Sequence, residues 1–529
     1  MFGVTTGVTG DGAEGLATVD AQDASDRPVT WLIDNAEAYR ALLAACRAAR
    51  RSIWISQLAF DADCVAYLPE DEAPAPGESR QMRLAEVLLA AANERGVDVR
   101  VLLNASLLLD TAASLREHFR AAGADPERLR IRGVSRFPQL LHAKIIVVDG
   151  TCAFLIGSPF VNGYWDDSHH QPMDPRRPRR ELGGRPLHDL SVRLRGQVVA
   201  ELGERFTEMW NGADDRVVGD DSPLEPTAST PHGDAEGGCT TVSIVGTAPT
   251  PRRAHHPARR TEILDAVLKG IARARALIYI EHQYLSSRPV AAALADALTR
   301  QPALEIIVVL NQNPDVTAYR GWQNSLLEES GLESHPRVGL FCLWSVGEAA
   351  AAGRRAITQV FVHSKVVTVD DQWAMVGSAN LDGVSLCSYG DDFRGPVGRR
   401  VFRDVRNFDV AAVLETADGH ATSAPVLELR LALWREHLDH PDLDASMPPA
   451  GGWLGYWHRC AAAGVRSLAL ARGGREQRIV VLPYSRQSTP ADQLRDVGAV
   501  VASGGLELCF NPSWMEVHLS PNWVRNMFA

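Results

Sequence analysis

The stretch FVHSKVVTVDDQWAMVGSAN occupies residues 361–380, and a shorter copy of its first half, LLHAKIIVVDG, occupies residues 140–150. Both copies read H-x-K-x4-D, on runs of Val and Ile that predict β-strands. Because residues i and i+2 of a strand point to the same face, the histidine and lysine of each copy are expected to project together. A nucleophile or proton carrier beside a fixed cation suits chemistry at a phosphate. The four residues are His142, Lys144, His363 and Lys365.

The order of elements around the two motifs is also repeated. Residues 30–60 predict a helix capped by Asp34 or Asn35 and then an apolar strand, and residues 260–285 predict the same pair again. A second apolar strand follows in each half, VRVLLNAS in the first and LEIIVVLNQN in the second. This alternation predicts an α/β fold built by internal duplication.

The composition is that of a globular protein of two or three domains, with 529 residues, of which 45% are hydrophobic and 22% charged. The formal net charge of −11 argues against a dedicated nucleic-acid binder, which usually carries a basic field. The eight cysteines form no C-x-x-C pair, which favours neither a cysteine zinc site nor a disulfide framework. We recognise no secretory signal and no long apolar segment, so the expected location is cytoplasmic or peripheral to a membrane.

Changes in composition predict where the chain divides. We expect a flexible arm at 1–27, a first lobe at 28–215, a linker at 216–240, a second lobe at 241–440 and a C-terminal appendage at 441–529. Each lobe contains one copy of the motif, so the two copies could supply an attacking group and a leaving-group acid to one site.

The second copy extends to H-x-K-x4-D-x6-G-S-x-N and ends in Gly377, Ser378 and Asn380. This string resembles the motif of the phospholipase D superfamily, and the chain looks most like a bacterial phospholipase D over roughly residues 28–440. The resemblance implies an α/β fold in which two similar lobes, each a mixed sheet flanked by helices, pack about a pseudo-twofold axis. It also implies a monomer with an internal pseudo-dimer, here with a small C-terminal appendage.

The same resemblance implies a mechanism that needs no metal and no cofactor. His142 would attack phosphorus and form a covalent phosphohistidine. His363 would protonate the leaving alcohol and then activate water or an acceptor alcohol, since a histidine titrates near neutral pH. Lys144 and Lys365 would supply the positive charge that a metal supplies elsewhere.

Four aspartates belong to the candidate site. The motif residues Asp149 and Asp370 follow the strands and are expected to tie each strand end to its neighbours. A separate carboxylate must fix the tautomer of each histidine. Asp189, in PLHDLSVRLRG, resembles the W-H-D segment of phospholipases D, and Asp409, in NFDVAAVL, follows the second motif in a matching place. A solvated aspartate at a strand start is the alternative for both.

Further residues are candidates for substrate contacts. Ser378 and Asn380 are expected to hydrogen-bond phosphate oxygens, and Ser158 to face them from the first lobe. The first copy departs from the pattern, because an asparagine follows its serine by four residues instead of two. Glu281 and Gln283, in YIEHQYL, resemble a phospholipase D strand that lines the head-group side, although a buried strand is the alternative reading.

The resemblance favours a phospholipid at a membrane surface as the substrate and gives no reason to expect nucleic acid. Arg-rich loops at 176–180 and 251–260 would meet anionic lipid or gate the pocket, unless they are simply solvated. The leading hypothesis is hydrolysis to phosphatidate and a head-group alcohol, with transfer to another alcohol as a second outcome. The alternatives are a cardiolipin synthase-like phosphatidyltransferase, a nucleic-acid phosphodiesterase, and a binding module that has kept the fold.

Overall fold

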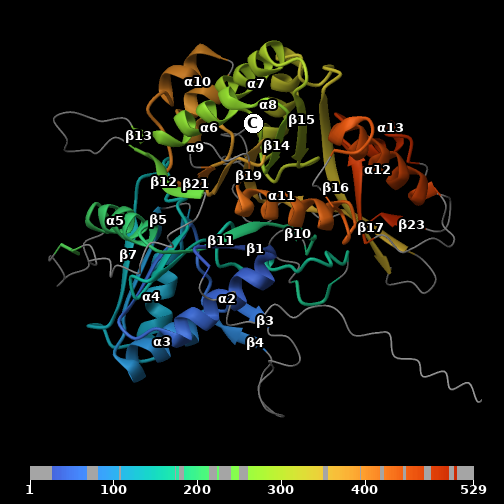
Figure 1. Ribbon diagram of the computed structural model, residues 1–529. Coiled ribbons are helices and arrows are strands. Elements are labelled where there is room, and N and C mark those ends of the chain that lie inside the picture. The colour runs from blue at the N-terminus through green and yellow to red at the C-terminus, as the bar shows by residue number, and fades with distance from the viewer. Residues whose placement is uncertain are drawn as a thin grey trace, which may run out of the picture.

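The structure, a computed structural model, describes residues 27–67, 81–106, 109–172, 174–177, 184–213, 223–225, 240–249, 260–348, 355–393, 395–416, 422–444, 448–469, 478–499 and 506–508. Nearly all of the predicted arm and most of the predicted linker lie outside these residues. Within them, two mixed sheets lie one above the other, each with helices on its outer face (Figure 1). None of the helices in these ranges is both long and apolar enough to cross a bilayer.

The first sheet belongs to the N-terminal half of the chain. In spatial order it contains β1 (Val29–Ile33), β11 (Leu190–Arg195), β9 (Cys152–Leu155), β8 (Ile145–Val148), β2 (Ser52–Ser56), β5 (Asp98–Ser106) and β6 (Leu109–Asp110), with β7 (Leu129–Val134) also paired to β5. Strand β2 is parallel to β5 and antiparallel to β8. Parallel and antiparallel pairs therefore meet at the strand next to the first motif.

The second sheet repeats this order. It contains β13 (Arg260–Thr261), β12 (Thr240–Ala248), β21 (Asp409–Thr416), β20 (Trp373–Gly377), β19 (Lys365–Val369), β14 (Leu277–His282), β15 (Glu305–Leu310), β16 (Val338–Glu348), β17 (Arg355–Gln359) and β23 (Leu506–Leu508), with β22 (Ile479–Pro483) paired to β16. Here β14 is parallel to β15 and antiparallel to β19. The run β1-β11-β9-β8-β2-β5-β7 thus corresponds to β12-β21-β20-β19-β14-β15-β16. The predicted α/β fold with two similar lobes is confirmed.

The helices form three layers around the two sheets. The outer layer of the first lobe contains α2 (Asp34–Ala48), α3 (Leu84–Arg95) and α4 (Thr111–Ala121). The outer layer of the second lobe contains α6 (Glu262–Arg273), α7 (Arg288–Arg300) and α8 (Thr317–Glu329). Between the sheets lie α5 (Val198–Asn211), α11 (Ala424–His437) and α12 (Gly452–Ala469) (Figure 1). The remaining elements are η1 (Asn162–Tyr164), α9 (Gly383–Leu386), η2 (Tyr389–Asp392), α10 (Pro396–Val401), α13 (Pro490–Asp496), and the small sheets β3 (Val65–Tyr67) with β4 (Gln81–Arg83) and β10 (Leu187–His188) with β18 (Phe361–Val362).

The apolar core follows from the alternation of side chains along the motif strands. In β8, Ile145 and Val147 face the layer between the sheets, whereas Ile146 and Val148 face the outer helices. In the described parts of the predicted appendage, α12 packs into the layer between the sheets and β22 pairs with β16. The two lobes therefore share one continuous core, which fixes their motifs relative to each other.

The motif histidines lie just before the strands on which the sequence places them. Strand β8 begins at Ile145, after His142 and Lys144, and β19 begins at Lys365, after His363. The reason is that each histidine segment leaves its own sheet and bonds to the other lobe. The β10–β18 pair and the bridge between Leu141 and Phe408 are these contacts.

Candidate active site between the two lobes

The two motif segments meet where the lobes join. The backbone N–H of His142 donates to the carbonyl of Phe408 over 2.9 Å, and the backbone N–H of His363 donates to the carbonyl of His188 over 2.8 Å. In both cases the residue that follows the accepting carbonyl in the sequence is one of the two predicted aspartates, Asp409 or Asp189. The backbone therefore delivers a carboxylate from each lobe to the histidine of the other.

Each histidine ring is paired with that carboxylate. The Nδ1 atom of His142 lies 2.7 Å from Asp409 Oδ1, and the Nδ1 atom of His363 lies 2.9 Å from Asp189 Oδ2. All four side chains are buried. A carboxylate that accepts from Nδ1–H leaves Nε2 without a proton in the neutral ring, which is the form that attacks or accepts a proton. The sequence suggested both aspartates but gave no sign that they cross between lobes.

The two predicted serines bind the same carboxylates. The hydroxyl of Ser378 donates to Asp409 Oδ1 over 2.6 Å, and the hydroxyl of Ser158 donates to Asp189 Oδ2. Both serines thus hold the carboxylate that holds the histidine. Asn380 is 5% exposed, and its side-chain oxygen has no hydrogen-bond partner among the described residues.

The two lysines bring positive charge into a buried place. Each is 1% exposed, and its ammonium donates to the backbone carbonyl of the histidine in its own motif, over 3.0 Å for Lys144. Burial, and then the charge of the other lysine, lowers the pKa of Lys144 to about 7. Burial likewise lowers the pKa of Lys365 to about 8. The positive charge of one lysine disfavours the charged form of the other, so a bound anion would stabilise the site.

The histidines are neutral and Asp189 is ionised at neutral pH. Burial, and then the nearby lysine, lowers the pKa of His142, and the same two causes lower the pKa of His363 to about 3. Burial alone would raise the pKa of Asp189, but its contacts with His363 and Ser158 and the charge of Lys365 together outweigh burial and lower this pKa to about 2. The site therefore presents two unprotonated imidazoles beside two lysines.

The motif aspartates bind backbone at the far end of their strands. Asp149 accepts from the N–H groups of residues 50–52 over 2.7–2.9 Å, and Asp370 accepts from those of residues 275–277 over the same range. Both have a left-handed backbone, with φ of 54° and 52°. They hold the turn after each motif strand against the strand that begins beside it, β2 or β14.

Glu281 and Gln283 lie inside the protein, at 0% and 4% exposure. Glu281 accepts from the hydroxyl of Tyr279 over 2.6 Å and lies 2.7 Å from Nε2 of His437. Gln283 donates to the hydroxyl of Tyr284 over 2.9 Å. The buried-strand alternative therefore fits both side chains better than an open head-group wall.

Three other residues of the first lobe also have partners away from the histidines. Asn162, the displaced asparagine of the first motif, donates to the carbonyl of Asp63 and accepts from the N–H of Val65. Arg176 and Arg177 form ion pairs with aspartates of their own loop. Arg179, Arg180 and almost all of the loop at 251–260 lie outside the described residues.

Sequence reasoning did not explain the glycines of the motifs. A Cβ atom on Gly157 would overlap the carboxylate of Asp189, and a Cβ atom on Gly377 would overlap the backbone of Val410 and Ala411. Both glycines therefore allow the aspartate-bearing strand to approach. The N-terminal helix supplies Asn35, whose side chain donates to the Ser158 hydroxyl over 2.9 Å instead of capping the helix.

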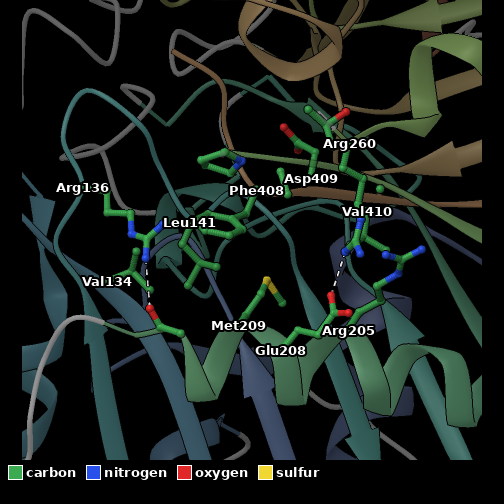
Figure 2. Close-up of a pocket in the computed structure, with 15 residues that line it drawn as sticks. Val134, Arg136, Leu141, Arg205, Glu208, Met209, Arg260, Phe408, Asp409 and Val410 are labelled. Atoms are coloured by element: carbon green, nitrogen blue, oxygen red, sulfur yellow. Dashed lines mark hydrogen bonds and ion pairs between the residues drawn. The ribbon is translucent and has the colours of Figure 1, made fainter. Parts of the chain in front are cut away.

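A cavity of about 410 Å³ lies beside Asp409, at the junction of the lobes. Figure 2 shows Met209 rising from α5 toward this space and three arginines around it. Arg260 pairs with Glu208 over 2.7 Å, and Arg136 donates to the carbonyl of Gly212 over 3.1 Å. The labelled lining residues are Val134, Arg136, Leu141, Arg205, Glu208, Met209, Arg260, Phe408, Asp409 and Val410.

Comparison with known proteins identifies a family whose model matches part of this chain. Residues 267–391, which include the second H-x-K-x4-D motif, match the family described as "Cardiolipin synthase, PLD-like domain". These residues are therefore similar to a phospholipase D-like domain, and the predicted resemblance to the phospholipase D superfamily is confirmed.

Two curated relatives illustrate the likeness. The chain is 33% identical over 126 residues to phospholipase D zeta 1 of Arabidopsis thaliana, covering 23% of this chain and 11% of that protein. It is 24% identical over 309 residues to cardiolipin synthase 2 of Staphylococcus epidermidis, covering 55% of this chain and 52% of that protein. The matches thus span about half or less of these relatives. A crystal structure of phosphatidylserine synthase from Haemophilus influenzae aligns with a TM-score of 0.48 and 14% identity, covering 78% of this chain and 86% of that one.

Proposed function

We propose that this protein is a phosphodiesterase of the phospholipase D type, which cleaves the distal phosphodiester of a glycerophospholipid into phosphatidate and a free head-group alcohol. One observation carries the proposal. Two buried histidines each donate Nδ1–H to a carboxylate of the opposite lobe, over 2.7 and 2.9 Å, beside two buried lysines. This arrangement supplies an attacking group, a proton carrier and charge for phosphate oxygens within one site.

In the first step His142 is the nucleophile and His363 the general acid. Asp409 accepts the Nδ1–H of His142, so its Nε2 lone pair attacks phosphorus as the bond to the head-group oxygen breaks. The departing alcohol takes a proton from Nε2 of His363, whose Nδ1–H stays with Asp189. The anionic phosphodiester offsets the lysine charges, which favours the protonated form of His363 that this step needs.

In the second step the covalent phosphohistidine is resolved. Nε2 of His363 takes a proton from water, the resulting oxygen attacks phosphorus, and the P–N bond to His142 breaks. Phosphatidate leaves and both rings return to their starting protonation states. Lys144 and Lys365 neutralise the non-bridging oxygens in both steps, and the side-chain N–H of Asn380, which is 5% exposed, donates to one of them.

Transfer to a second lipid alcohol is the second candidate function. The matched family and one relative carry the name cardiolipin synthase. The two histidines are only 8% and 3% exposed, which restricts the water that competes with an acceptor alcohol. The same phosphohistidine would then be attacked by an alcohol in place of water.

The test uses vesicles of phosphatidylcholine, phosphatidylethanolamine or phosphatidylglycerol, with EDTA and a short-chain alcohol present. Head-group release and the ratio of phosphatidate to phosphatidylalcohol are measured for the wild type, His142→Ala and His363→Ala. His440→Ala, which removes an exposed histidine outside the site, is the matched control. We expect both site variants to lose about 10⁴-fold in kcat and the control to lose nothing.

The product ratio separates hydrolysis from transfer. Turnover of both site variants within about tenfold of the wild type would show that the histidines do not perform the chemistry. Cleavage of bis(p-nitrophenyl) phosphate without cleavage of any lipid would keep the phosphodiester reaction and remove the lipid from the proposal.

A further inference from the structure

A cluster of histidines and carboxylates outside the proposed reaction lies where α11 of the second lobe meets the first lobe. Its central members are Asp34, which begins α2, His170, His188, which ends β10, and Glu436, near the end of α11. Figure 1 shows α11 beside β10 and β1, between the two sheets. The ligand atoms of these four side chains all lie within 4.8 Å of one another.

Four of the separations between these side chains are close to those in a small cation's ligand set, with Asp34 facing each histidine through a different oxygen. Nδ1 of His188 lies 2.8 Å from Glu436 Oε1 and 3.1 Å from Asp34 Oδ1. Nε2 of His170 lies 3.3 Å from Glu436 Oε1 and 3.5 Å from Asp34 Oδ2. Four ligands placed about 2.0–2.1 Å from a tetrahedral zinc ion lie about 3.3 Å from one another.

Two of these buried groups make no hydrogen bond despite the short distances. Both ring nitrogens of His188, and Oδ2 of Asp34, have no hydrogen-bond partner among the described residues, and both side chains are at most 1% exposed. The distances to the neighbouring atoms are within hydrogen-bond range, so it is the angles at these atoms that exclude a hydrogen bond. Polar atoms that face a shared point without bonding one another are arranged as ligands of a third atom.

The other nitrogen of each histidine lies near a second carboxylate, but only that of His170 makes a hydrogen bond with it. Nδ1 of His170 lies 2.8 Å from Asp166 Oδ2, and Nε2 of His188 lies 2.8 Å from Glu281 Oε1. Histidines that bind metals usually donate their second N–H to a carboxylate, which fixes the ring and the tautomer. The Asp166 contact thus sets His170 to present an unprotonated Nε2 to the cluster, while the His188 ring lies between Glu281 on one side and Asp34 and Glu436 on the other without a hydrogen bond to any of them.

The charge balance of the cluster points the same way. Asp34, Asp166 and Glu281 are buried carboxylates and the Glu436 side chain is 10% exposed, and Arg177, on Asp166, is the one arginine or lysine ion-paired to these four within the described residues. Their other charge partners among the described residues are His170, His188 and His437, which offset a carboxylate only when they are protonated, and a buried carboxylate without an opposite charge is costly. A divalent cation on the two histidine nitrogens would neutralise most of the remaining charge.

We propose that Asp34, His170, His188 and Glu436 bind one divalent transition-metal ion, of which zinc fits best, as a structural link between the two lobes. Nitrogen and oxygen ligands in a closed tetrahedral set suit zinc, and four protein ligands leave no position for substrate. The site is distinct from the proposed reaction, which needs no metal. It lies one residue from Asp189, so the ion would also hold the segment that orients His363.

The first test is the metal content of untagged wild-type protein, purified without added metal and measured by inductively coupled plasma mass spectrometry. We expect about one zinc per chain. His170→Gln and Glu436→Gln each remove one ligand, and we expect them to retain about a tenth of that amount or less. His169→Gln is the matched control, because this neighbouring histidine is 49% exposed and should leave the zinc content unchanged.

Thermal unfolding gives a second readout that does not require a folded variant. Stripping the wild type with a strong chelator in mild denaturant should lower Tm, and added Zn²⁺ should restore it. Wild-type protein without stoichiometric metal, and without a rise in Tm on adding Zn²⁺, would overturn the proposal in favour of protonated histidines. Equal zinc in the wild type, His170→Gln and Glu436→Gln would overturn it too, because the ion would then lie elsewhere.

Discussion

The two histidine–aspartate pairs look alike, yet removing their charges should have unequal effects. Asp409 uses only Oδ1, which accepts from both His142 and Ser378, while its Oδ2 has no partner among the described residues. In Asp409→Asn the amide oxygen can keep the Oδ1 position, so His142 keeps its tautomer. The loss is then the difference between a charged and a neutral hydrogen bond, about 1–1.5 kcal/mol, or about tenfold in kcat.

Asp189 has no such freedom, because both of its oxygens are used. Oδ2 faces His363 and Ser158, and Oδ1 accepts from the backbone N–H of Leu190 over 2.8 Å. In Asp189→Asn the amide nitrogen must face one of these donors. Facing the backbone leaves a buried donor unpaired, at a cost of about 1–3 kcal/mol, and facing His363 reverses its tautomer. A reversed tautomer costs about 10⁴-fold in the serine-protease triad.

Asp189→Asn should therefore lose about 10³–10⁴-fold in kcat, against about tenfold for Asp409→Asn. Single-turnover head-group release from vesicles, with bis(p-nitrophenyl) phosphate as a second substrate, measures both losses. Circular dichroism confirms that each variant is folded. Losses within threefold of each other would refute the argument from oxygen use, and so would a larger loss in Asp409→Asn.

Two other predictions follow from the site. Gly157→Ala should displace the Asp189 carboxylate and lower kcat at least about 100-fold, and full activity in this variant would contradict the predicted overlap. Gly321→Ala is the contrasting variant, because Gly321 lies in helix α8 with open space around it, and thermal unfolding should show a rise in stability of about 0.5–1 kcal/mol. Burial lowers the pKa of Lys144 to about 7 and that of Lys365 to about 8, so charge is lost as pH rises through these values and kcat/KM should fall above pH 7–8. Lys144→Arg stays charged and should move this alkaline limb upward even if kcat is lower, and an unmoved limb would assign it to another group.

The sequence predicted the parts of the fold that depend on local pattern. Repeated helix–strand units and the H-x-K spacing led to two similar lobes, because periodicity and motif spacing are local properties of the chain. The candidates Asp189 and Asp409 came from their places after each motif. The sequence could not predict that each aspartate pairs with the histidine of the opposite lobe, since this pairing depends on how the two sheets pack.

The roles of residues outside any motif could not be predicted either, because these roles also depend on contacts that are distant in the sequence. Asp34 and Asn35 read as helix caps, because short polar side chains before an apolar periodic run usually cap a helix. In the structure Asn35 holds the Ser158 hydroxyl, and Asp34 faces His188 and His170. Each of these contacts spans more than a hundred residues. Glu281 was expected beside a head group, yet it lies in the same buried cluster as His188.

The reciprocal pairing explains why a single copy of the motif would not complete this site. A lobe by itself would carry His142 without Asp409, or His363 without Asp189, and so would lack the group that fixes the histidine tautomer. The shared core between the sheets, with α5 and α11 inside it, holds the two carboxylates in place across the junction. Any change that shifts the lobes by a fraction of a hydrogen-bond length would loosen both pairs at once. The interface between the lobes is therefore as much a part of the proposed catalytic machinery as the histidines themselves.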